Sequence, residues 1–236
     1  GHTKYKSALL KNYINLDIKK NILQSNSKIY VEKFLEHEKL IPSDLIEIHN
    51  RPNYVKFLSQ NTNSKLILYF HNDPLTMNGS KSLIERRDLL KKTHKLVFNS
   101  KWSRDRFLQS FNKFEIPEDK LNVIYQSSKK VKINFNKKRK IISFVGKLNS
   151  AKGYDLFGSA ILKILDKYKD WKAIVIGDEP REKLTFQHKN LKILGFKSHK
   201  IVLNYFNVVS ISVVCSRWNE PFGRTSLEAS SRGCAL

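Results

Sequence analysis

The sequence predicts an α/β protein with mainly parallel sheets, arranged in two series of elements. Short apolar runs alternate with segments of helical periodicity along most of the 236 residues. This alternation is the pattern of repeated strand–helix–strand units. A lysine-rich stretch near the middle separates the two series. In open parallel sheets ligands bind beyond the carboxyl ends of the strands, so we expect functional residues there.

The first series is expected to carry four strands. The pattern is weak up to residue 43, apart from a short helix over 31–40. Beyond it we expect strands over 45–49, 65–71, 95–99 and 121–125, and helices over 54–58, 83–92 and 101–114. A polar loop, 72–80, follows the second strand. His71 ends that strand, where a histidine is as often a local hydrogen-bonding residue as part of a site.

A break in composition divides the two series. Residues 127–140 are rich in lysine, and a solvated linker is the favoured interpretation. An electrostatic contact with a membrane or nucleic acid is the alternative, although Phe135 is the only aromatic residue available for stacking on bases. The predicted organisation is an N-terminal domain over 1–128, a basic linker over 129–140 and a C-terminal domain over 141–236.

The second series begins with a strand over 141–145 and a turn into a helix that ends near residue 168. Gly146 lets the backbone approach phosphate oxygens, and Lys147 and Lys152 could converge on one diphosphate across the turn. Solvated lysines are the alternative in so basic a chain. The turn is not a P-loop, because the GxxxxGK[ST] order is absent. Further strands are expected over 173–178 and 191–195, and a helix over 199–207.

Residues 208–233 predict a strand, a tight turn and a helix. The apolar run 208–215 precedes Pro221 and Gly223, which break the chain, and helical periodicity begins at residue 224. Glu220 and Glu228 flank the turn with seven residues between them. We expect both acids to face one crevice, beside backbone N–H groups at a helix N-terminus. The inward positions of the helix are expected to be Leu227, Ala229 and Ala235.

Composition bounds the function classes. The net charge of +23 fits nucleic acid, an anionic membrane surface or a general lysine bias, and abundant Lys, Asn and Ile favour the last as part of the explanation. Cys215 and Cys234 lack metal-binding or CxxC spacing, which predicts reduced thiols and a reducing cytosol. No apolar run approaches the roughly twenty residues that span a bilayer.

The segment Glu220-Pro-Phe-Gly-x4-Glu228-Ala resembles the Glu-x7-Glu signature of retaining glycosyltransferases, in particular the nucleotide-sugar-dependent glycosyltransferase family 4. The Gly146-Lys-Leu…Lys152-Gly element resembles the one that holds the donor diphosphate in that family. Residues 95–104 and 116–125 resemble the last units of its N-terminal, acceptor-side domain. The resemblance covers roughly residues 44–236 and implies a GT-B fold, with two Rossmann-like domains and an active site in the cleft between them.

The resemblance also implies roles for the candidate residues. Lys147 and Lys152, beside Gly146, would neutralise the charge that grows on the departing diphosphate. Glu228 would accept hydrogen bonds from the ribose hydroxyls, and His71 would lie beside the donor sugar. The transferred sugar would be bound by Glu220 and the backbone N–H groups of Phe222 and Gly223. Asp73 is a weaker candidate for contacting the acceptor. The expected catalytic residues are His71, Glu220, Lys147 and Lys152.

The expected reaction is transfer of a hexose, with retention, from a UDP- or GDP-sugar to a glycan or lipid-linked acceptor. No DxD triplet occurs, which fits a metal-independent mechanism, and no cofactor is expected. Bacterial polysaccharide or lipopolysaccharide synthesis at the cytoplasmic face of the membrane is the expected setting, with nucleic acid an unexpected partner.

The family's members begin earlier and continue past residue 236, so both ends are expected to be incomplete, which leaves the activity of this chain open. Two alternatives also remain open. One is a basic, non-catalytic module that binds nucleic acid or membrane. The other is a sugar-nucleotide epimerase or phosphorylase on the same fold.

Overall fold

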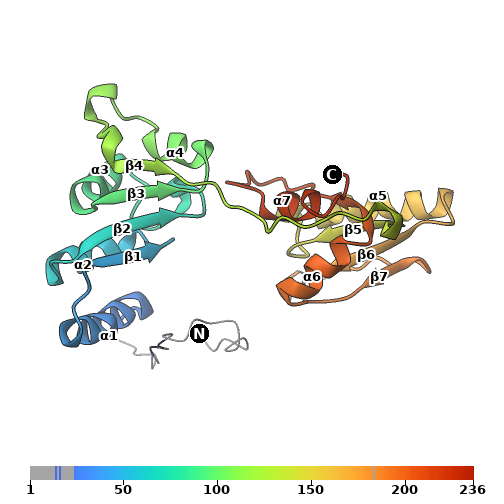
Figure 1. Cartoon of the computed structure of the whole chain (residues 1–236), viewed down its shortest axis with the longest axis horizontal. Helices are drawn as coiled ribbons and strands as arrows, with labels where there is room; N and C mark the ends of the chain where they lie inside the picture. Colours follow the sequence, from blue (N-terminus) through green and yellow to red (C-terminus); the bar gives the residue numbers. More distant parts are fainter. Residues whose placement is uncertain (1–13, 15, 17–23, 183) are drawn as a thin grey trace. The chain divides into compact units, whose positions relative to one another are not determined.

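The structure is a computed structural model that describes residues 14, 16, 24–182 and 184–236. The chain divides between Tyr125 and Gln126 into two compact units (Figure 1). Each unit contains a parallel sheet of four strands, in the order β1-β2-β3-β4 in the first unit and β7-β6-β5-β8 in the second. The predicted α/β class with parallel sheets is therefore confirmed.

The first unit alternates strands and helices as predicted. Its elements are α1 (Asn26–Leu40), β1 (Leu45–His49), α2 (Asn53–Asn61), β2 (Lys65–Phe70), α3 (Leu83–Lys92), β3 (Lys95–Phe98), α4 (Lys101–Leu108) and β4 (Leu121–Val123), with short 3₁₀ turns at Pro74–Thr76, Lys113–Glu115 and Glu118–Lys120. The predicted bounds of α3 are correct, because Ser82 and Glu85 form a capping box at its start.

The core of the first unit lies between the sheet and its helices. Alternate residues of each strand point the same way, so Leu66, Leu68 and Phe70 face inward together. Phe70 and Phe98 stack with ring centroids 5.4 Å apart, and Phe107 of α4 tilts against both. This aromatic cluster fixes the ends of β2 and β3 against α4.

Three helices of the first unit differ from their predicted bounds. α2 is longer than predicted, from Asn53 to Asn61 rather than over 54–58. α1 begins at Asn26 rather than residue 31, because the Ser25 side chain caps it by accepting from the Lys28 N–H. α4 ends at Leu108 rather than residue 114. The buried Arg86 guanidinium donates to the carbonyls of Phe107 and Gln109, and Ser110 takes the left-handed conformation with φ 70°. The Arg86 hydrogen bonds satisfy two carbonyls that a longer helix would have used, and the conformation of Ser110 turns the chain out of the helix.

The second unit contains β5 (Arg139–Val145), α5 (Tyr154–Lys167), β6 (Lys172–Ile176), β7 (Leu191–Ile193), α6 (His199–Phe206), β8 (Val209–Val213) and α7 (Arg224–Ser230), with 3₁₀ turns at Phe135–Lys137 and Ser150–Lys152. The chain runs from β5 outward through β6 to β7, and then returns to add β8 on the other side of β5. The order in which the chain adds strands therefore reverses between β5 and β8. Open α/β sheets bind ligands at such a switch point.

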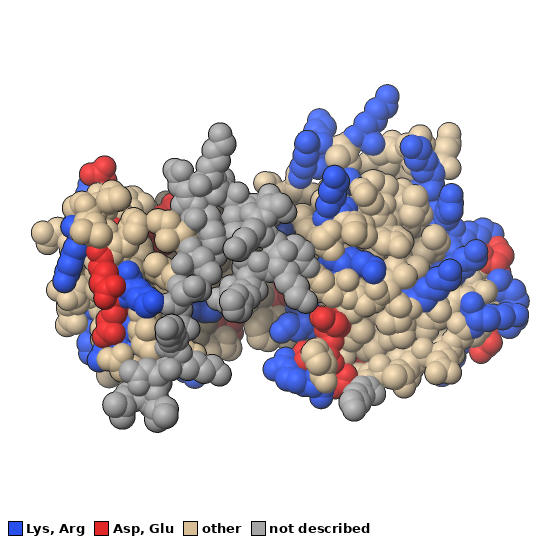
Figure 2. Space-filling model, turned by 90° about the horizontal axis from the view of Figure 1, so that it is seen from below, with Lys and Arg blue, Asp and Glu red and all other residues tan. Residues whose placement is uncertain are grey.

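The lysines of the basic stretch 127–140 are exposed, with the exception of Lys138. Lys138 donates through Nζ to the carbonyl oxygens of Phe206 at 2.8 Å and Val209 at 2.7 Å, so it joins the end of α6 to the start of β8. Lys140 pairs with Asp170. Figure 2 shows many further Lys and Arg side chains over the second unit, with few acidic ones among them.

α7 is shorter than predicted, and Ala235 does not lie on it. The helix ends at Ser230, and Gly233 follows with φ 76°, a left-handed conformation that glycine adopts without steric cost. Ala235 instead forms a parallel bridge with Ile211 of β8. Ala229 is fully buried as predicted, whereas Leu227 is only partly buried.

Among the described residues, no helix is long and apolar enough to cross a membrane. Neither cysteine forms a disulfide; Cys234 is buried and Cys215 partly so. Burial raises the pKa of both thiols above the ordinary value, which keeps them protonated at neutral pH.

Candidate functional site: the carboxyl edges of the two sheets

The switch point of the second sheet brings two predicted motifs together. β5 and β8 are neighbours, with Phe144 paired to Val213, so the turns that follow them leave the sheet side by side. The first turn runs from Gly146 to Gly153 and the second from Val214 to Gly223. Residues far apart in sequence therefore meet at one edge.

Lys152 and Glu220 form the central contact of this edge. Lys152 Nζ donates to Glu220 Oε1, and Ser216 Oγ donates to the same oxygen at 2.8 Å. The two side chains of the ion pair are 30% and 29% exposed. Partial burial acts to raise the pKa of Glu220, but the hydrogen bonds from Lys152 and Ser216 outweigh it and hold the pKa below its usual value. The edge thus contains an ionised carboxylate beside a cation.

The second turn is bound to the start of α5. Arg217 makes a two-pronged ion pair with Asp155, with both N–O distances 2.7 Å, and donates to the Ser150 carbonyl at 2.7 Å. The Arg217 N–H also donates to the carbonyl of Ala151. The hydrogen bonds from Arg217 lower the pKa of Asp155 to about 2. These contacts hold Glu220 in reach of Lys152.

Gly153 permits the close approach of the two turns. It caps α5 with φ 74°, and a Cβ atom at this position would lie 2.0 Å from the Cys215 carbonyl oxygen. Any side chain would therefore force the turns apart. The predicted Lys152-Gly153 pair has a steric reason as well as a chemical one.

Lys147 is placed differently from Lys152. It is exposed, and its charge acts on Glu179. The pKa of Glu179 falls to about 2, mainly through its hydrogen bonds with Arg181. The two predicted lysines therefore have different anionic neighbours, and their convergence on one diphosphate stays a prediction.

Glu228 lies on α7, behind the turn that ends at Gly223. Gly223 caps the helix with φ 81°, and Phe222 before it is partly exposed. Glu228 Oε1 accepts from Arg224 at 2.9 Å and lies 3.0 Å from His199 Nε2 at the start of α6. The Glu228 side chain is 14% exposed. Both contacts use Oε1, so Oε2 has no hydrogen bond to another residue in the described part of the chain.

In the first unit, the backbone of His71 is held from both neighbouring strands. The Asn50 side-chain oxygen, just beyond β1, accepts from the N–H groups of His71 and Asn72 at 3.2 Å each. The Asn99 amide, just beyond β3, donates to the His71 carbonyl at 2.9 Å. Asn50 itself is left-handed, with φ 58°. These bonds cross-link the carboxyl ends of three strands at His71.

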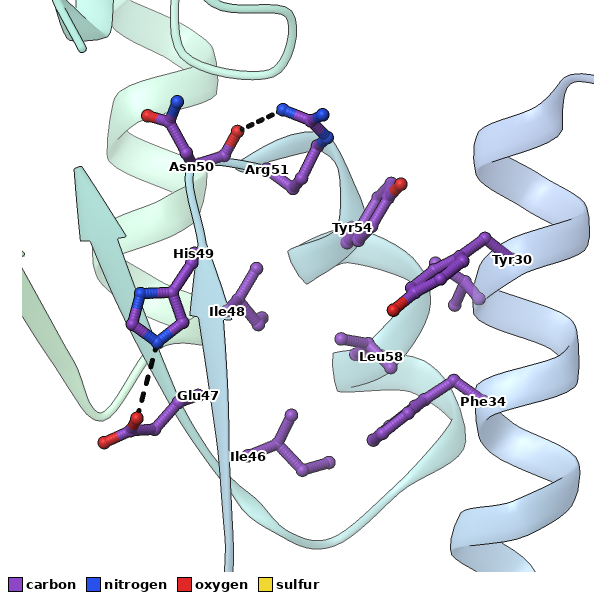
Figure 3. Close-up of a pocket in the computed structure, with 11 residues that line it drawn as sticks. Tyr30, Phe34, Ile46, Glu47, Ile48, His49, Asn50, Arg51, Tyr54 and Leu58 are labelled. Atoms are coloured by element: carbon purple, nitrogen blue, oxygen red, sulfur yellow. Dashed lines mark hydrogen bonds and ion pairs between the residues drawn. The ribbon is translucent and has the colours of Figure 1, made fainter. Parts of the chain in front are cut away.

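The His71 ring is bound to a second histidine. His71 Nε2 lies 3.0 Å from His49 Nδ1, and the rings are parallel with centroids 5.3 Å apart. His49 Nε2 lies 3.4 Å from Glu47 Oε2, and the Tyr69 hydroxyl donates to Glu47 Oε1 at 3.1 Å. Figure 3 shows Glu47 and His49 on the side of β1 opposite to Ile48.

Asp73 stabilises the loop in which it lies. Its carboxylate is largely buried and forms an ion pair with Arg106 at 3.0 Å. It also caps the turn Pro74–Thr76 by accepting from the Leu75 N–H at 3.0 Å. Both contacts are structural, and the predicted contact with an acceptor remains a prediction.

One cavity of the first unit is lined by Glu47, His49 and Asn50, the neighbours of His71, but not by His71 itself. It encloses about 710 Å³ between α1, α2 and β1, and its walls are mostly aromatic and aliphatic (Figure 3). None of the predicted site residues lines it. No group of three or more His, Cys, Asp or Glu side chains that could hold a metal ion is present in the described residues.

Several contributors were not predicted from the sequence. Glu47, His49 and Asn50 surround His71, and Arg217 and Asp155 join the two turns of the second unit. One signal was available: His49 ends a predicted strand just as His71 does, and adjacent parallel strands bring such residues together.

Comparison with known proteins identifies the second unit. Residues 126–236 match the family described as glycosyl transferases group 1. YtcC, a Bacillus subtilis protein classed with the glycosyltransferases, is 23% identical over 88% of this chain and 58% of its own length. The 2-deoxystreptamine N-acetyl-D-glucosaminyltransferase of Niallia circulans is 32% identical over 42% of this chain and 27% of its own. The chain thus spans little more than half of YtcC.

Solved structures give the same fold. Anabaena HepE, in complex with UDP and glucose, is similar with a TM-score of 0.63 and 16% identity, over 91% of this chain and 64% of its own. The pneumococcal O-GlcNAc transferase GtfA, in complex with UDP and GlcNAc, has a TM-score of 0.67 and 13% identity, over 87% of this chain and 44% of its own. These likenesses confirm the predicted GT-B fold. The second unit, residues 126–236, thus matches the group 1 glycosyltransferases.

Proposed function

We propose that the chain binds a nucleotide diphosphate sugar through its second unit and transfers the sugar to a glycan or lipid-linked acceptor. The observation that carries the proposal is the Lys152–Glu220 pair at the switch point between β5 and β8. HepE and GtfA were each solved with UDP and a sugar, which supports a UDP-sugar as donor. We further propose that the sugar is a hexose and that its anomeric configuration is retained.

The chemistry follows from the charges at this edge. As the glycosidic bond to the diphosphate breaks, negative charge grows on the leaving phosphate, and a nearby cation lowers the barrier. Lys152 supplies that cation, with Lys147 as a second source. Glu220, kept ionised by its neighbours, accepts hydrogen bonds from hydroxyls of the transferred sugar. Glu228 has an oxygen left for the ribose hydroxyls.

We propose that the reaction needs no metal ion, because lysines supply the positive charge and the sequence contains no DxD triplet. No side chain is assigned as a nucleophile. Retention would then come from attack by the acceptor on the face that the diphosphate leaves, with that phosphate taking the acceptor's proton.

The test is release of the nucleotide from UDP-glucose, UDP-N-acetylglucosamine and GDP-mannose, followed with and without EDTA. We expect one donor to be consumed, at a rate that EDTA leaves unchanged. Loss of turnover with EDTA would contradict metal independence. Formation of an epimerised sugar nucleotide, rather than free nucleotide, would support the epimerase alternative.

We also propose peripheral contact with an anionic membrane at the cytoplasmic face, since the net charge is +23 and many basic side chains lie on the visible face of the second unit (Figure 2). Flotation with vesicles containing phosphatidylglycerol should recover the protein at low salt, and neutral vesicles should not. Tight, salt-sensitive binding to nucleic acid without any response to sugar nucleotides would favour the non-catalytic module instead.

A further inference from the structure

A cavity of the second unit lies at the opposite edge of the sheet from the Lys152–Glu220 pair. β5 and β8 begin side by side there, with Arg139 paired to Val209, whereas the turns that carry Lys152 and Glu220 follow the carboxyl ends of these strands. The cavity encloses about 270 Å³. Its lining includes two amides and three cations: Asn134, Asn207, Lys132, Lys137 and Arg232.

The walls of this cavity are held together by contacts within the second unit. Gly233 has φ 76°, and a Cβ atom there would lie 2.7 Å from Ile133 Cγ2, so a side chain at this position would push Ile133 away. The hydroxyl oxygens of Ser128 and Ser231 lie 2.9 Å apart. Lys138 joins the end of α6 to the start of β8. The segment before β5 is therefore fixed against the turn after α7.

The cavity is positive, and no acidic side chain lines it. No Asp or Glu occurs in the three segments that build it, residues 126–140, 199–215 and 229–236. Lys138 adds a further charge beside Cys234, whose thiol stays protonated because burial raises its pKa. Cations gathered around a hollow without acidic neighbours create a positive potential that attracts an anion.

Arg232 is the lining residue best suited to select the kind of anion. Its Nη1 donates to Asn207 Oδ1 at 3.1 Å, which orients the guanidinium. Its buried Nε has no hydrogen-bond partner among the described residues. A guanidinium presents a planar fork of donors that matches the oxygen atoms of a phosphate. Arg232 is thus oriented by the protein while part of its donor set is unused.

We propose that this cavity binds a phosphate group, which accepts hydrogen bonds from Arg232 and is neutralised by Lys132 and Lys137. Pockets that hold whole drug-sized ligands enclose about 300–1,000 Å³, so a volume of about 270 Å³ favours one phosphate group over an entire nucleotide. Two sources share this chemistry, a soluble phosphate compound and the headgroup of an anionic lipid. The site is separate from the proposed donor site and does not depend on it.

The first arm of the test titrates the 236-residue chain with inorganic phosphate at constant ionic strength. The reporters are the backbone amide NMR signals of Ile133, Asn207 and Gly233, where we expect saturable shifts. Arg232→Gln should weaken phosphate binding about ten- to a hundredfold, because it removes charge-assisted hydrogen bonds. Lys152→Ala, at the opposite edge of the sheet, should leave the titration of these amides unchanged.

Two double variants separate the cavity from the basic stretch as a whole. One combines Lys132→Gln with Lys137→Gln, and the other combines Lys129→Gln with Lys130→Gln. Both remove two charges from the same stretch, but Lys129 and Lys130 do not line the cavity. All four lysines are exposed, so both variants should fold normally, which circular dichroism checks. The first should weaken phosphate binding more than the second, and equal losses would overturn the proposal.

The second arm replaces inorganic phosphate with vesicles of phosphatidylcholine that contain phosphatidic acid, and measures flotation of the wild type and of Arg232→Gln. Binding that depends on Arg232 in this arm alone identifies a lipid headgroup as the source, and in the first arm alone a soluble phosphate. Binding in neither arm, or binding that is the same in Arg232→Gln, overturns the proposal. Phosphate shifts that are lost in Lys152→Ala but kept in Arg232→Gln would also overturn it, while the proposed function would stand.

Discussion

The carboxyl edges of the two sheets are built on different principles. In the second unit the edge is charged: Lys152 pairs with Glu220, and Arg217 pairs with Asp155. In the first unit it is joined mainly by hydrogen bonds from the Asn50 and Asn99 side chains to the backbone at His71, and an ion pair, Asp73 with Arg106, lies in the loop beyond β2. An edge of ion pairs suits a charged diphosphate, and an edge of neutral donors and acceptors suits hydroxyl groups.

The two edges also differ in how their residues are brought together. A change of direction in the strand order places the turns after β5 and β8 side by side, and Gly153 lets them touch. The first sheet runs in simple order, so its edge depends on side chains that reach across from one strand end to the next. The following predictions test this contrast, from the largest expected effect to the smallest.

Lys152→Ala should have the largest effect. It removes the cation beside the diphosphate and leaves Glu220 ionised without its main partner, so we expect turnover of the sugar nucleotide to fall about 10²- to 10³-fold, as for loss of one preorganised transition-state contact. Lys147→Ala is the comparison. Lys147 is exposed, and its charge acts on Glu179 rather than on Glu220, so its loss should reduce turnover less. Equal losses in steady-state kinetics would contradict this ranking.

Gly153→Ala should destabilise the second unit. The left-handed backbone and the clash with the Cys215 carbonyl together should lower the free energy of unfolding by about 1–3 kcal/mol or more, measured by urea denaturation. Gly195→Ala is a matched control, since Gly195 has φ 67° but nothing within 4 Å of an added Cβ. If both variants lose the same stability, backbone strain alone explains the effect and close approach of the turns does not matter.

Asn50→Leu should loosen the edge of the first unit. It removes the acceptor for the N–H groups of His71 and Asn72 and puts a branched side chain at a left-handed position. We expect a loss of about 1–3 kcal/mol in the free energy of unfolding. Asn50→Asp retains an acceptor and tolerates the conformation, so it should lose less. Amide hydrogen exchange at His71 and Asn72 would show whether the effect is local.

The smallest effect concerns the Arg217–Asp155 pair, which is 45% and 33% exposed and so contributes little at neutral pH. Because the pKa of Asp155 is lowered to about 2, the pair's stabilisation is present above the ordinary carboxyl range and is lost as the pH falls toward 2. Arg217→Gln should therefore have a shallower decline in melting temperature between about pH 4 and pH 2. Parallel declines in both proteins would show that the pair does not contribute.

Much of the second unit could be predicted from the sequence, because its signals are local. Apolar runs and glycine turns marked the strands and helices, and the spacing of Glu220 and Glu228 marked the motif. Lys152 and Glu220 lie 68 positions apart in the sequence, so their pairing follows only from the strand order. The predicted extent of α7 was wrong, because the helix ends before Gly233, whose left-handed conformation periodicity alone does not show.

The first unit shows the limit more clearly. His71 was predicted as a candidate, but its neighbours Glu47 and His49 were not, because their contact depends on the register of β1 against β2. Helix lengths were also affected by tertiary contacts. α4 ends early because a buried arginine from α3 binds its last carbonyls, and no local pattern encodes that contact.

The central claim is that the switch point of the second sheet binds a nucleotide diphosphate through Lys152. The most direct measurement is thermal stabilisation by UDP, GDP and their sugar conjugates in the wild type, in Lys152→Ala and in Lys169→Ala, which removes an exposed lysine paired with Asp166. A ligand at about a hundred times its dissociation constant should stabilise the wild type by roughly 2.7 kcal/mol. We expect Lys169→Ala to keep this response and Lys152→Ala to lose it. No stabilisation by any nucleotide, or equal stabilisation of all three proteins, would contradict the claim.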